Sequence, residues 1–577
     1  MKHRTIGQTL WIVAWILAIT TGTLPGQEAR ETHVATSSGQ MVASVSPLAT
    51  AAGLEAFRRG GNAVDAAIAT ALTLGVVDSY NSGIGGGCFV LVRTSDGQFH
   101  VIDGREMAPQ AASRDMFLRA GQADGSLSQH GPLAVGTPGA VAAYAEAVAK
   151  FGVLAWPDLV RPAAELAERG FSVTPAMARL LRANQAWLAK FGGAHGGLLS
   201  QDGQAYRPEE IMRQPELAAT YRALAEHGPD WFYRGEFAQR IDAWFRENGG
   251  LLTAADLAAY RTVPREPLVT SYRGFTVVGV PPPSSGGVHV AQMLNILETF
   301  DLAKLQAQDP ALVSHVIAEA MKLAFADRAF WLGDPDFADV PFGLVNKDYA
   351  RQLAQKIRLD AVLRPVEHGD PRTFDPRMFE KHTTHIATAD AAGNWVALTT
   401  TVNTSFGSKV VVPGTGVVLN NQMDDFSISP GEPNAYGLIG ADANAIEPGK
   451  RPLSSMSPTI IVRDGQPILT VGAAGGPKII TQVLLAIVRS LDLGYSPERA
   501  VVEPRFHHQF APDSLFYESG LPAAQLERLT TLGHRLRAED SGGVCQLIAF
   551  DPVTRQFVGV ADPRAGGSAA GLPKMGK

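Results

Sequence analysis

The chain has 577 residues, of which 45% are hydrophobic and 18% are charged, and its formal net charge is −6. This composition is typical of a globular protein, and the length alone is enough for about three or four average domains. No block of Lys and Arg stands out, which argues against nucleic acid or an anionic membrane as the main partner.

The N-terminus has the layout of a secretory signal. Residues 2–4 are basic, the apolar run Leu10–Ile19 follows, and small and turn residues extend to Gly26. The apolar run is shorter than the roughly 20 residues that a membrane span needs, although an uncleaved anchor is the alternative interpretation. We therefore predict a signal peptide over residues 1–26 and a mature protein that is periplasmic or secreted and has no membrane span.

From Pro47 onward, helix and strand patterns alternate, which predicts an α+β fold whose sheets are covered by helices on their outer faces. Asn62 is placed to cap one of these helices. Apolar spacing predicts helices over Leu48–Arg59, Ala63–Val77, Leu159–Arg169, Pro175–Lys190, Pro215–His227, Val288–Phe300, Leu312–Leu332 and Ile479–Ser490. Short apolar or alternating runs predict strands within Ser82–Val92, Gln98–Asp103, Val277–Val280, Thr383–Thr388, Trp395–Val402, Gly416–Leu419, Thr459–Arg463 and Ile468–Gly472.

Two segments lack regular periodicity. Arg358–Lys381 is charged and contains proline, which predicts an exposed connector. Ser429–Pro452 is rich in Gly, Pro and Asn and is long for a loop in a compact domain, so we expect it to be functional. Between the two segments, Thr383–Thr388 and Trp395–Val402 flank a short turn, which predicts a β-hairpin at the start of a buried sheet.

Familiar catalytic and metal-binding motifs do not fit this chain. The glycines at 83–87 lack the Lys-Ser/Thr ending of a P-loop and lead into a strand, so a tight turn is the better interpretation. No G-x-S-x-G or H-E-x-x-H pattern occurs, and His507 and His508 would point to opposite faces of a strand. We therefore predict no metal and no cofactor. Cys88 and Cys545 lie in apolar strand-like runs, which favours two buried thiols over a disulfide.

Thr383 opens a strand directly after the connector. A threonine hydroxyl is a good nucleophile only beside a base, and the residue's own α-amino group can serve if the chain is cut before it. A free amino terminus has a pKa of roughly 7.7–8.0, which suits proton transfer near neutral pH. An ordinary strand residue is the alternative interpretation.

A series of motifs from Gly60 to Gly567 bears on this choice. They are G-G-N-A-V-D-A-A at Gly60, D-G-R-E-M-A-P at Asp103, P-P-P-S-S-G-G at Pro281, T-T-H at Thr383, L-N-N-Q-M-D-D-F at Leu419, R-P-L-S-S-M-S-P-T at Arg451, G-A-A-G-G at Gly472 and D-P-R at Asp562. In these motifs and their spacing the chain resembles the γ-glutamyltransferase (glutathione hydrolase) family of N-terminal-nucleophile hydrolases. The resemblance implies a four-layer αββα sandwich assembled from two subunits of one precursor.

The resemblance also implies self-processing and an activity. Thr383 would attack the carbonyl of His382, leaving a large subunit, residues 27–382, and a small catalytic subunit, residues 383–577, associated as a heterodimer. Thr383 would then take the γ-glutamyl group of glutathione or a related amide. Water, or an amino acid or peptide acceptor, would release that group.

Catalytic roles follow position by position from the same resemblance. Thr401 would support the nucleophile, and Gly475 and Gly476 would form an oxyanion hole of backbone N–H groups. Ala473-Ala474 departs from the Ser-Pro of many bacterial members, but both glycines remain. Lys409 replaces a smaller residue of some members, either to tune acceptor access or simply to face solvent.

Substrate-binding roles follow in the same way. Arg105, with Ser454 and Ser455, would hold the α-carboxylate, because a guanidinium grips a carboxylate with two charge-assisted bonds. Tyr436, in the long loop, resembles the aromatic residue that closes over the site in members with a lid. The residues implied to bind the α-amino group are Asn403, Gln422 and Asp425.

Two alternatives stay open. A glutaryl-type acylase of the same fold would act on substrates without an α-amino group, which give no reason for a carboxylate at Asp425. An uncleaved, inactive binding homologue would have no need of Thr383, Thr401 and the glycine pair. The preferred donor and the balance between hydrolysis and transfer are not determined by these residues.

Overall fold

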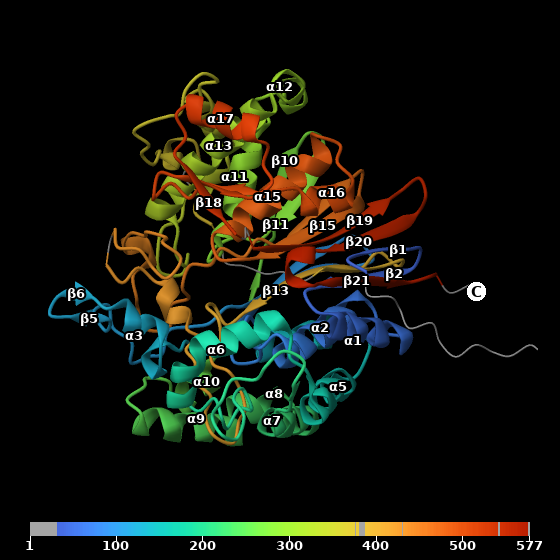
Figure 1. The fold of residues 1–577 in the computed structure, drawn as a ribbon, viewed down its shortest axis with the longest axis vertical. Coiled ribbons are helices and arrows are strands. Elements are labelled where there is room, and N and C mark those ends of the chain that lie inside the picture. Colours follow the sequence, from blue (N-terminus) through green and yellow to red (C-terminus); the bar gives the residue numbers. More distant parts are fainter. Residues whose placement is uncertain (1–31, 376, 380–386, 430, 541–542, 575–577) are drawn as a thin grey trace, which may run out of the picture. The chain divides into compact units, whose positions relative to one another are not determined.

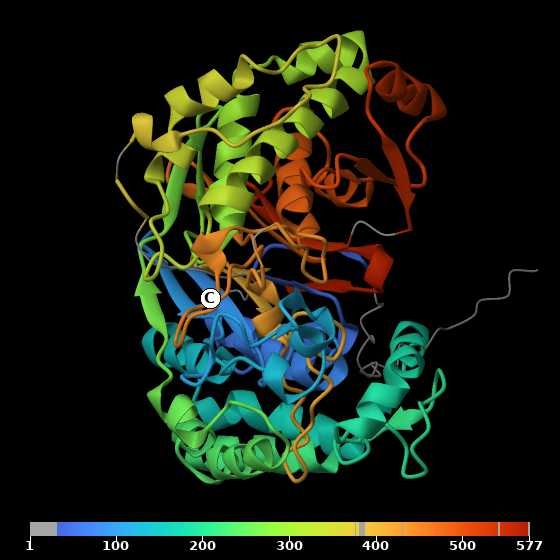
Figure 2. The same cartoon turned by 90° about the vertical axis from the view of Figure 1, so that its left-hand side faces the viewer.

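Two antiparallel sheets, each of seven strands, lie face to face in the part of the chain that the computed structural model describes (Figures 1 and 2). The described residues are 32–375, 377–379, 387–429, 431–540 and 543–574. The first sheet contains, in spatial order, β1 (Val34–Ser37), β20 (Gln556–Ala561), β19 (Val544–Asp551), β15 (Gln466–Ala474), β14 (Thr459–Arg463), β11 (Phe275–Gly279) and β10 (Leu268–Tyr272). The second sheet contains β21 (Ser568–Leu572), β2 (Gln40–Ser44), β12 (Ala387–Asp390), β13 (Trp395–Thr401), β3 (Gly87–Arg93), β4 (Phe99–Gly104) and β9 (Val263–Arg265).

Helices cover the outer face of each sheet, which makes four layers (Figure 1). On the side of the first sheet lie α11 (Ser285–Leu297), α12 (Leu302–Gln308), α13 (Pro310–Trp331), α14 (Lys347–Ala354), α15 (Lys478–Leu491), α16 (Pro497–Val502) and α17 (Ala523–Thr531). On the side of the second sheet lie α1 (Pro47–Arg58), α2 (Ala63–Val77), α3 (Gly125–Gln129), α4 (Ala140–Phe151), α5 (Trp156–Arg169), α6 (Pro175–Lys190), α7 (Pro215–His227), α8 (Pro229–Tyr233), α9 (Glu236–Glu247) and α10 (Ala254–Ala259).

Alternation along the strands separates three layers of core. On β3, Leu91 packs between the sheets, whereas Val90 and Val92 pack against the helices on the outer face. On β14, Ile460 packs between the sheets and Ile461 faces the opposite helices. Because successive strand side chains point to opposite faces, an apolar strand without polar alternation must be covered on both sides. The predicted αββα layering is therefore confirmed, and the residues from Thr32 onward form one compact unit rather than several domains.

Most predicted elements are confirmed within a few residues. Asn62 caps α2 as expected, accepting hydrogen bonds from the backbone N–H groups of Val64 and Asp65 while Asp65 bonds back to the N–H of Asn62. The hairpin is present as β12 and β13, but it lies in the middle of its sheet, between β2 and β3. Residues 383–386, which the predicted first strand included, lie outside the described residues.

One predicted helix start and one predicted strand are wrong. The helix expected from Val288 begins at Ser285, because the Ser284 side chain caps it and two glycines allow close packing of its first turn. A Cβ atom on Gly286 would lie 2.1 Å from the Met456 carbonyl oxygen. The strand expected at 416–419 is a turn region with one isolated bridge, between Val411 and Val418.

Both cysteines are buried free thiols, as predicted. Cys88 lies on β3 and Cys545 on β19, in different sheets. The remaining short strands are β5 (Leu118–Arg119), β6 (Gln122–Ala123), β7 (Phe171–Ser172), β8 (Ile211–Met212), β16 (Phe506–His507), β17 (Leu515–Glu518) and β18 (Leu536–Glu539). Among the described helices, none has the length and apolar character that crossing a membrane requires.

Candidate active site

A cavity of about 410 Å³ opens where strand ends and loops from both sheets meet. Its wall includes the ends of β13 and β15, the turn Asp78–Ser82 and part of the long loop. All of the predicted site residues that the structure describes line it: Arg105, Thr401, Asn403, Gln422, Asp425, Tyr436, Ser454, Ser455, Gly475 and Gly476. His382 and Thr383 lie outside the described residues, but Ala387, four residues after Thr383, also lines the cavity.

The end of β13 is held by a short network of hydrogen bonds. The Asn403 backbone N–H donates to Thr401 Oγ1 at 2.8 Å, and the Val402 N–H donates to the Asn81 carbonyl oxygen at 2.9 Å. Asn403 has a φ of +80°, a left-handed conformation that asparagine tolerates better than most residues. This conformation turns the chain away from the strand directly after Thr401.

An ion pair joins Arg105 to Asp425 in the cavity wall. Their Nη2 and Oδ2 atoms are 2.5 Å apart, and Arg105 is 1% exposed. Arg105 Nε also donates to the Pro452 carbonyl oxygen at 3.0 Å, which fixes the guanidinium plane. Burial raises the pKa of Asp425, and Arg105 opposes that rise. A buried cation and anion side by side complement a ligand that carries a carboxylate next to an ammonium group.

Two neighbouring groups add to this pair. Gln422 Nε2 lies 3.5 Å from Asp425 Oδ2, at the limit of a hydrogen bond. Glu106 Oε2 is 3.3 Å from Arg105 Nη1, and burial raises the pKa of Glu106 to about 7 although Arg105 opposes that rise. The shorter contact, 2.5 Å against 3.3 Å, makes Asp425 the principal negative partner of Arg105.

Ser454 and Ser455 also line the cavity, directly after Leu453, whose carbonyl oxygen accepts a hydrogen bond from Arg105 Nη2 at 3.3 Å. Their backbone is tied to the P-P-P-S-S-G-G segment: the Ser454 N–H donates to the Pro283 carbonyl oxygen at 2.8 Å, and the Ser285 hydroxyl donates to the Ser454 carbonyl oxygen at 2.7 Å. The serine pair is thus held in an extended conformation by a bridge between Ser284 and Ser454.

Gly475 and Gly476 connect β15 to the N-terminus of α15. Their φ angles are +133° and +60°, which favour glycine. Within the described residues neither backbone N–H has a hydrogen-bond acceptor, and both glycines line the cavity. Free N–H groups at the positive end of a helix dipole are suited to stabilise an oxyanion.

Tyr436 lies directly over Gly476. A Cβ atom on Gly476 would be 2.6 Å from Cδ1 of the tyrosine ring. The Tyr436 hydroxyl donates to the Asn403 carbonyl oxygen at 2.8 Å, and Gln509 Nε2 donates to the carbonyl oxygens of Tyr436 and Gly437. The long loop is therefore anchored across the cavity, with its aromatic ring against the glycine pair.

Lys409 does not face solvent. The residue is 3% exposed, and its Nζ donates to the Gly407 carbonyl oxygen at 2.8 Å and to Thr404 Oγ1 at 3.2 Å. Burial lowers its pKa to about 8, against the opposing charge of Asp424. Of its two predicted roles, facing solvent is wrong. Lys409 instead braces the turn that carries Thr404, a residue of the cavity wall.

Arg328 is a cavity residue that the sequence patterns did not single out. It belongs to α13, where it is 5% exposed. The sequence of α13 gave only a weak indication of this position. The helix carries charged residues but no continuous polar stripe, so some of those charged residues had to be buried.

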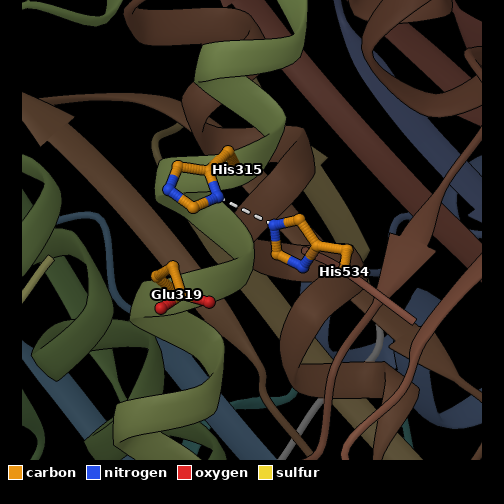
Figure 3. A group of neighbouring side chains, drawn as sticks. All are labelled: His315, Glu319 and His534. Atoms are coloured by element: carbon orange, nitrogen blue, oxygen red, sulfur yellow. Dashed lines mark hydrogen bonds between the residues drawn. The ribbon is translucent and has the colours of Figure 1, made fainter. Parts of the chain in front are cut away.

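One group of described side chains has the chemistry of metal ligands: His315, Glu319 and His534, whose donor atoms lie within 4.8 Å of one another (Figure 3). His315 Nδ1 and His534 Nε2 are hydrogen-bonded at 2.8 Å, and His315 Nε2 lies 2.6 Å from the Arg358 carbonyl oxygen. In such a hydrogen bond the two ring nitrogens point at each other rather than at a shared third position.

The third member of that group also has partners. Glu319 lies 2.7 Å from Lys322 Nζ, and its other oxygen accepts a hydrogen bond from the Leu363 N–H at 2.7 Å. An ammonium group beside the carboxylate opposes the binding of a cation. We therefore assign these side chains a structural role, in which they hold α13 to the connector and to the turn before β18.

Known proteins resemble this chain over most of its length. The sequence profile of the Gamma-glutamyltranspeptidase family matches residues 49–572. The chain belongs to the γ-glutamyltranspeptidase family. It is 43% identical to a glutathione hydrolase proenzyme of Escherichia coli over 528 residues, covering 91% of this chain and 90% of that protein.

Acylases are also similar to this γ-glutamyltranspeptidase family member. An Acylase ACY 1 proenzyme of a Pseudomonas species is 37% identical and covers 95% of this chain and 96% of its own length. The crystal structure of a cephalosporin acylase from Bacillus halodurans matches with a TM-score of 0.83 and 31% identity, over 97% of this chain and 100% of that chain. The fold is thus shared by γ-glutamyltranspeptidases and acylases, and the substrate must be argued from the cavity.

Proposed function

We propose that this family member is a self-processed γ-glutamyltransferase and glutathione hydrolase. The observation that carries the proposal is the Arg105–Asp425 ion pair beside Ser454 and Ser455 in the cavity wall. An α-amino acid group carries a carboxylate and an ammonium on one carbon. Its carboxylate can pair with Arg105 and its ammonium with Asp425, so no buried charge is left unpaired when the ligand binds. In this pocket Arg105, Ser454 and Ser455 hold the α-carboxylate. Asp425, Gln422 and Asn403 hold the α-ammonium.

In the proposed reaction, Thr383 Oγ attacks the γ-carbonyl carbon while its own α-amino group takes the hydroxyl proton. Thr401 supports the nucleophile through its hydroxyl. The N–H groups of Gly475 and Gly476 stabilise the oxyanion until the amine leaves with a proton. The γ-glutamyl ester on Thr383 is then released by water as glutamate, or by the amine of an amino acid or peptide as a new γ-glutamyl amide.

The proposal includes cleavage before Thr383 into chains 27–382 and 383–577 after removal of a signal peptide, in a periplasmic or secreted protein. Sheet topology supports lasting association of the two chains. Five strand pairs would join them: β1–β20 and β11–β14 in the first sheet, and β21–β2, β2–β12 and β13–β3 in the second. Chains interleaved in both sheets cannot separate without losing many backbone hydrogen bonds and both sheet cores.

The decisive experiment compares turnover of a γ-glutamyl chromogenic anilide with that of the glutaryl anilide, which lacks the α-ammonium group. Preference for the γ-glutamyl compound supports the proposal, and preference for the glutaryl compound supports the acylase alternative. Adding a dipeptide acceptor measures transfer against hydrolysis. A denaturing gel of the purified protein tests processing: two chains, one beginning at Thr383, are expected, and one full-length band would indicate the inactive binding homologue.

A further inference from the structure

Arg328 reaches the cavity wall from the last turns of α13, in the layer of helices that covers the first sheet. Its Nε donates a hydrogen bond to Ser285 Oγ at 2.9 Å, and its Nη2 donates to Ser455 Oγ at 3.1 Å. One guanidinium thus connects the N-terminal turn of α11 to the serine pair of the cavity.

The Ser285 hydroxyl has a partner both for its oxygen and for its hydrogen. It accepts from Arg328 and donates to the Ser454 carbonyl oxygen at 2.7 Å. The Ser285 backbone N–H donates to the same carbonyl oxygen at 2.8 Å. Ser285 therefore serves as a fixed acceptor that sets the plane of the Arg328 guanidinium.

The Ser455 hydroxyl is in a different situation. It accepts from Arg328, and within the described residues its own O–H has no acceptor. A hydroxyl whose oxygen already accepts a bond from a cation has its hydrogen left for a further acceptor. Because Ser455 lines the cavity, that acceptor is a ligand group there, and a carboxylate oxygen fits best.

Among the described residues, Arg328 also has no direct ion-pair partner. No carboxylate of the described residues lies within ion-pair distance of its guanidinium, whereas Arg105 is paired with Asp425 at 2.5 Å. Burial lowers the pKa of Arg328 to about 10, although the charge of Asp425 opposes that change, so the group remains a cation at neutral pH. A buried cation with only hydroxyl partners adds positive potential to this side of the cavity.

We propose that Arg328 is a positioning residue for the substrate carboxylate, acting through the Ser455 hydroxyl, which it orients as a donor. This inference rests on the proposed function and extends it by one residue outside the predicted set. It also gives a role to Ser285, inside the P-P-P-S-S-G-G motif, because Ser285 orients the arginine that orients Ser455.

The test is a double-mutant cycle of Arg328→Met and Ser455→Ala, measured with the γ-glutamyl anilide and with the 4-aminobutanoyl anilide, which lacks the carboxylate. We expect Arg328→Met to raise KM for the γ-glutamyl compound about tenfold, as for loss of a hydrogen bond to a charged group, with kcat changed less than about threefold. KM for the 4-aminobutanoyl compound should not change. The double variant should resemble Ser455→Ala alone, because Arg328 acts through that hydroxyl.

Unchanged KM in Arg328→Met, or effects of the two substitutions that multiply, would overturn the positioning role. Arg273→Met is the matched control, since Arg273 bonds to carbonyl groups at the other end of α11 and does not line the cavity. Arg328→Lys keeps the charge without the planar fork and should give a smaller rise in KM. If Arg328→Met does not yield folded, two-chain protein, KM of Arg328→Lys is compared with that of the wild type instead.

Failure of the proposed function would be seen separately. If the wild-type protein prefers the glutaryl anilide, the γ-glutamyl assignment fails. The glutaryl group keeps the carboxylate, so the same cycle measured with it still tests the role of Arg328.

Discussion

The Tyr436 hydroxyl donates a hydrogen bond to the Asn403 carbonyl oxygen at 2.8 Å, which ties the long loop to the turn that follows β13. The same ring packs on Gly476. One side chain therefore contacts both the proposed amino-group pocket and the proposed oxyanion hole, and it anchors its part of the loop at the cavity wall.

Removing the Tyr436 hydroxyl should weaken the attachment of the long loop to the turn after β13. We expect Tyr436→Phe to raise KM for the γ-glutamyl anilide about three- to tenfold, because a hydrogen bond of this kind contributes about 0.5–1.5 kcal/mol. Steady-state kinetics measures the change. Tyr517→Phe, on β17 and outside the cavity wall, is the control and should behave like the wild type. Equal KM values for both variants would show that the hydroxyl contact does not hold the loop over the substrate.

Asp425 should discriminate between γ-glutamyl and glutaryl compounds. Asp425→Asn removes the proposed negative partner of the substrate ammonium, and we expect kcat/KM for the γ-glutamyl anilide to fall about 30- to 100-fold. The glutaryl anilide should be affected much less, since it has no ammonium group. Exposed Asp464→Asn serves as the control for loss of one negative charge. A parallel fall for both anilides would argue that Asp425 acts only by holding Arg105.

Gly476→Ala should lower kcat more than it changes KM. The new Cβ would meet the Tyr436 ring at 2.6 Å, and the φ of +60° disfavours alanine, so the N–H would move from its position. Loss of one oxyanion-hole donor costs about 100-fold in kcat, and we expect a fall of that order with a smaller change in KM. Gly494→Ala, at a positive φ with open space around it, controls for backbone strain alone. If kcat falls equally there, strain rather than the oxyanion hole explains the loss.

The loss of stability at acidic pH should depend on His534. Burial lowers its pKa to about 2, below the value of roughly 6.5 in an unfolded chain. Between these values the unfolded state binds a proton that the folded state does not, so the free energy of unfolding decreases as the pH falls from about 6.5. The melting temperature of His534→Gln should therefore depend less on pH between 7 and 4 than that of the wild type. His195→Gln is the control for replacing a histidine at an exposed position. Parallel curves for His534→Gln and the wild type would contradict the low pKa.

Local residues largely determined the elements. The capping box at Asn62 and Asp65 lies within one helical turn, so it can be predicted from neighbouring residues alone. The boundaries of β14 were predicted to the residue, since an apolar run between polar residues has few alternatives. The start of α11 was missed because it depends on packing of Gly286 against Met456, far away in the chain.

The family motifs predicted which residues gather at the cavity, and every described member of that set lines it. Properties of neighbouring residues, such as helix caps, strand alternation and the order of motifs, can be predicted from the sequence alone. The pairing of Arg105 with Asp425, the burial of Lys409 and the contact of Arg328 with Ser455 depend on how distant segments pack. Arg105 and Asp425 are 320 positions apart, and Arg328 and Ser455 are 127 apart. The partner of a buried charge is set by the packing of whole layers, which no local pattern of residues contains.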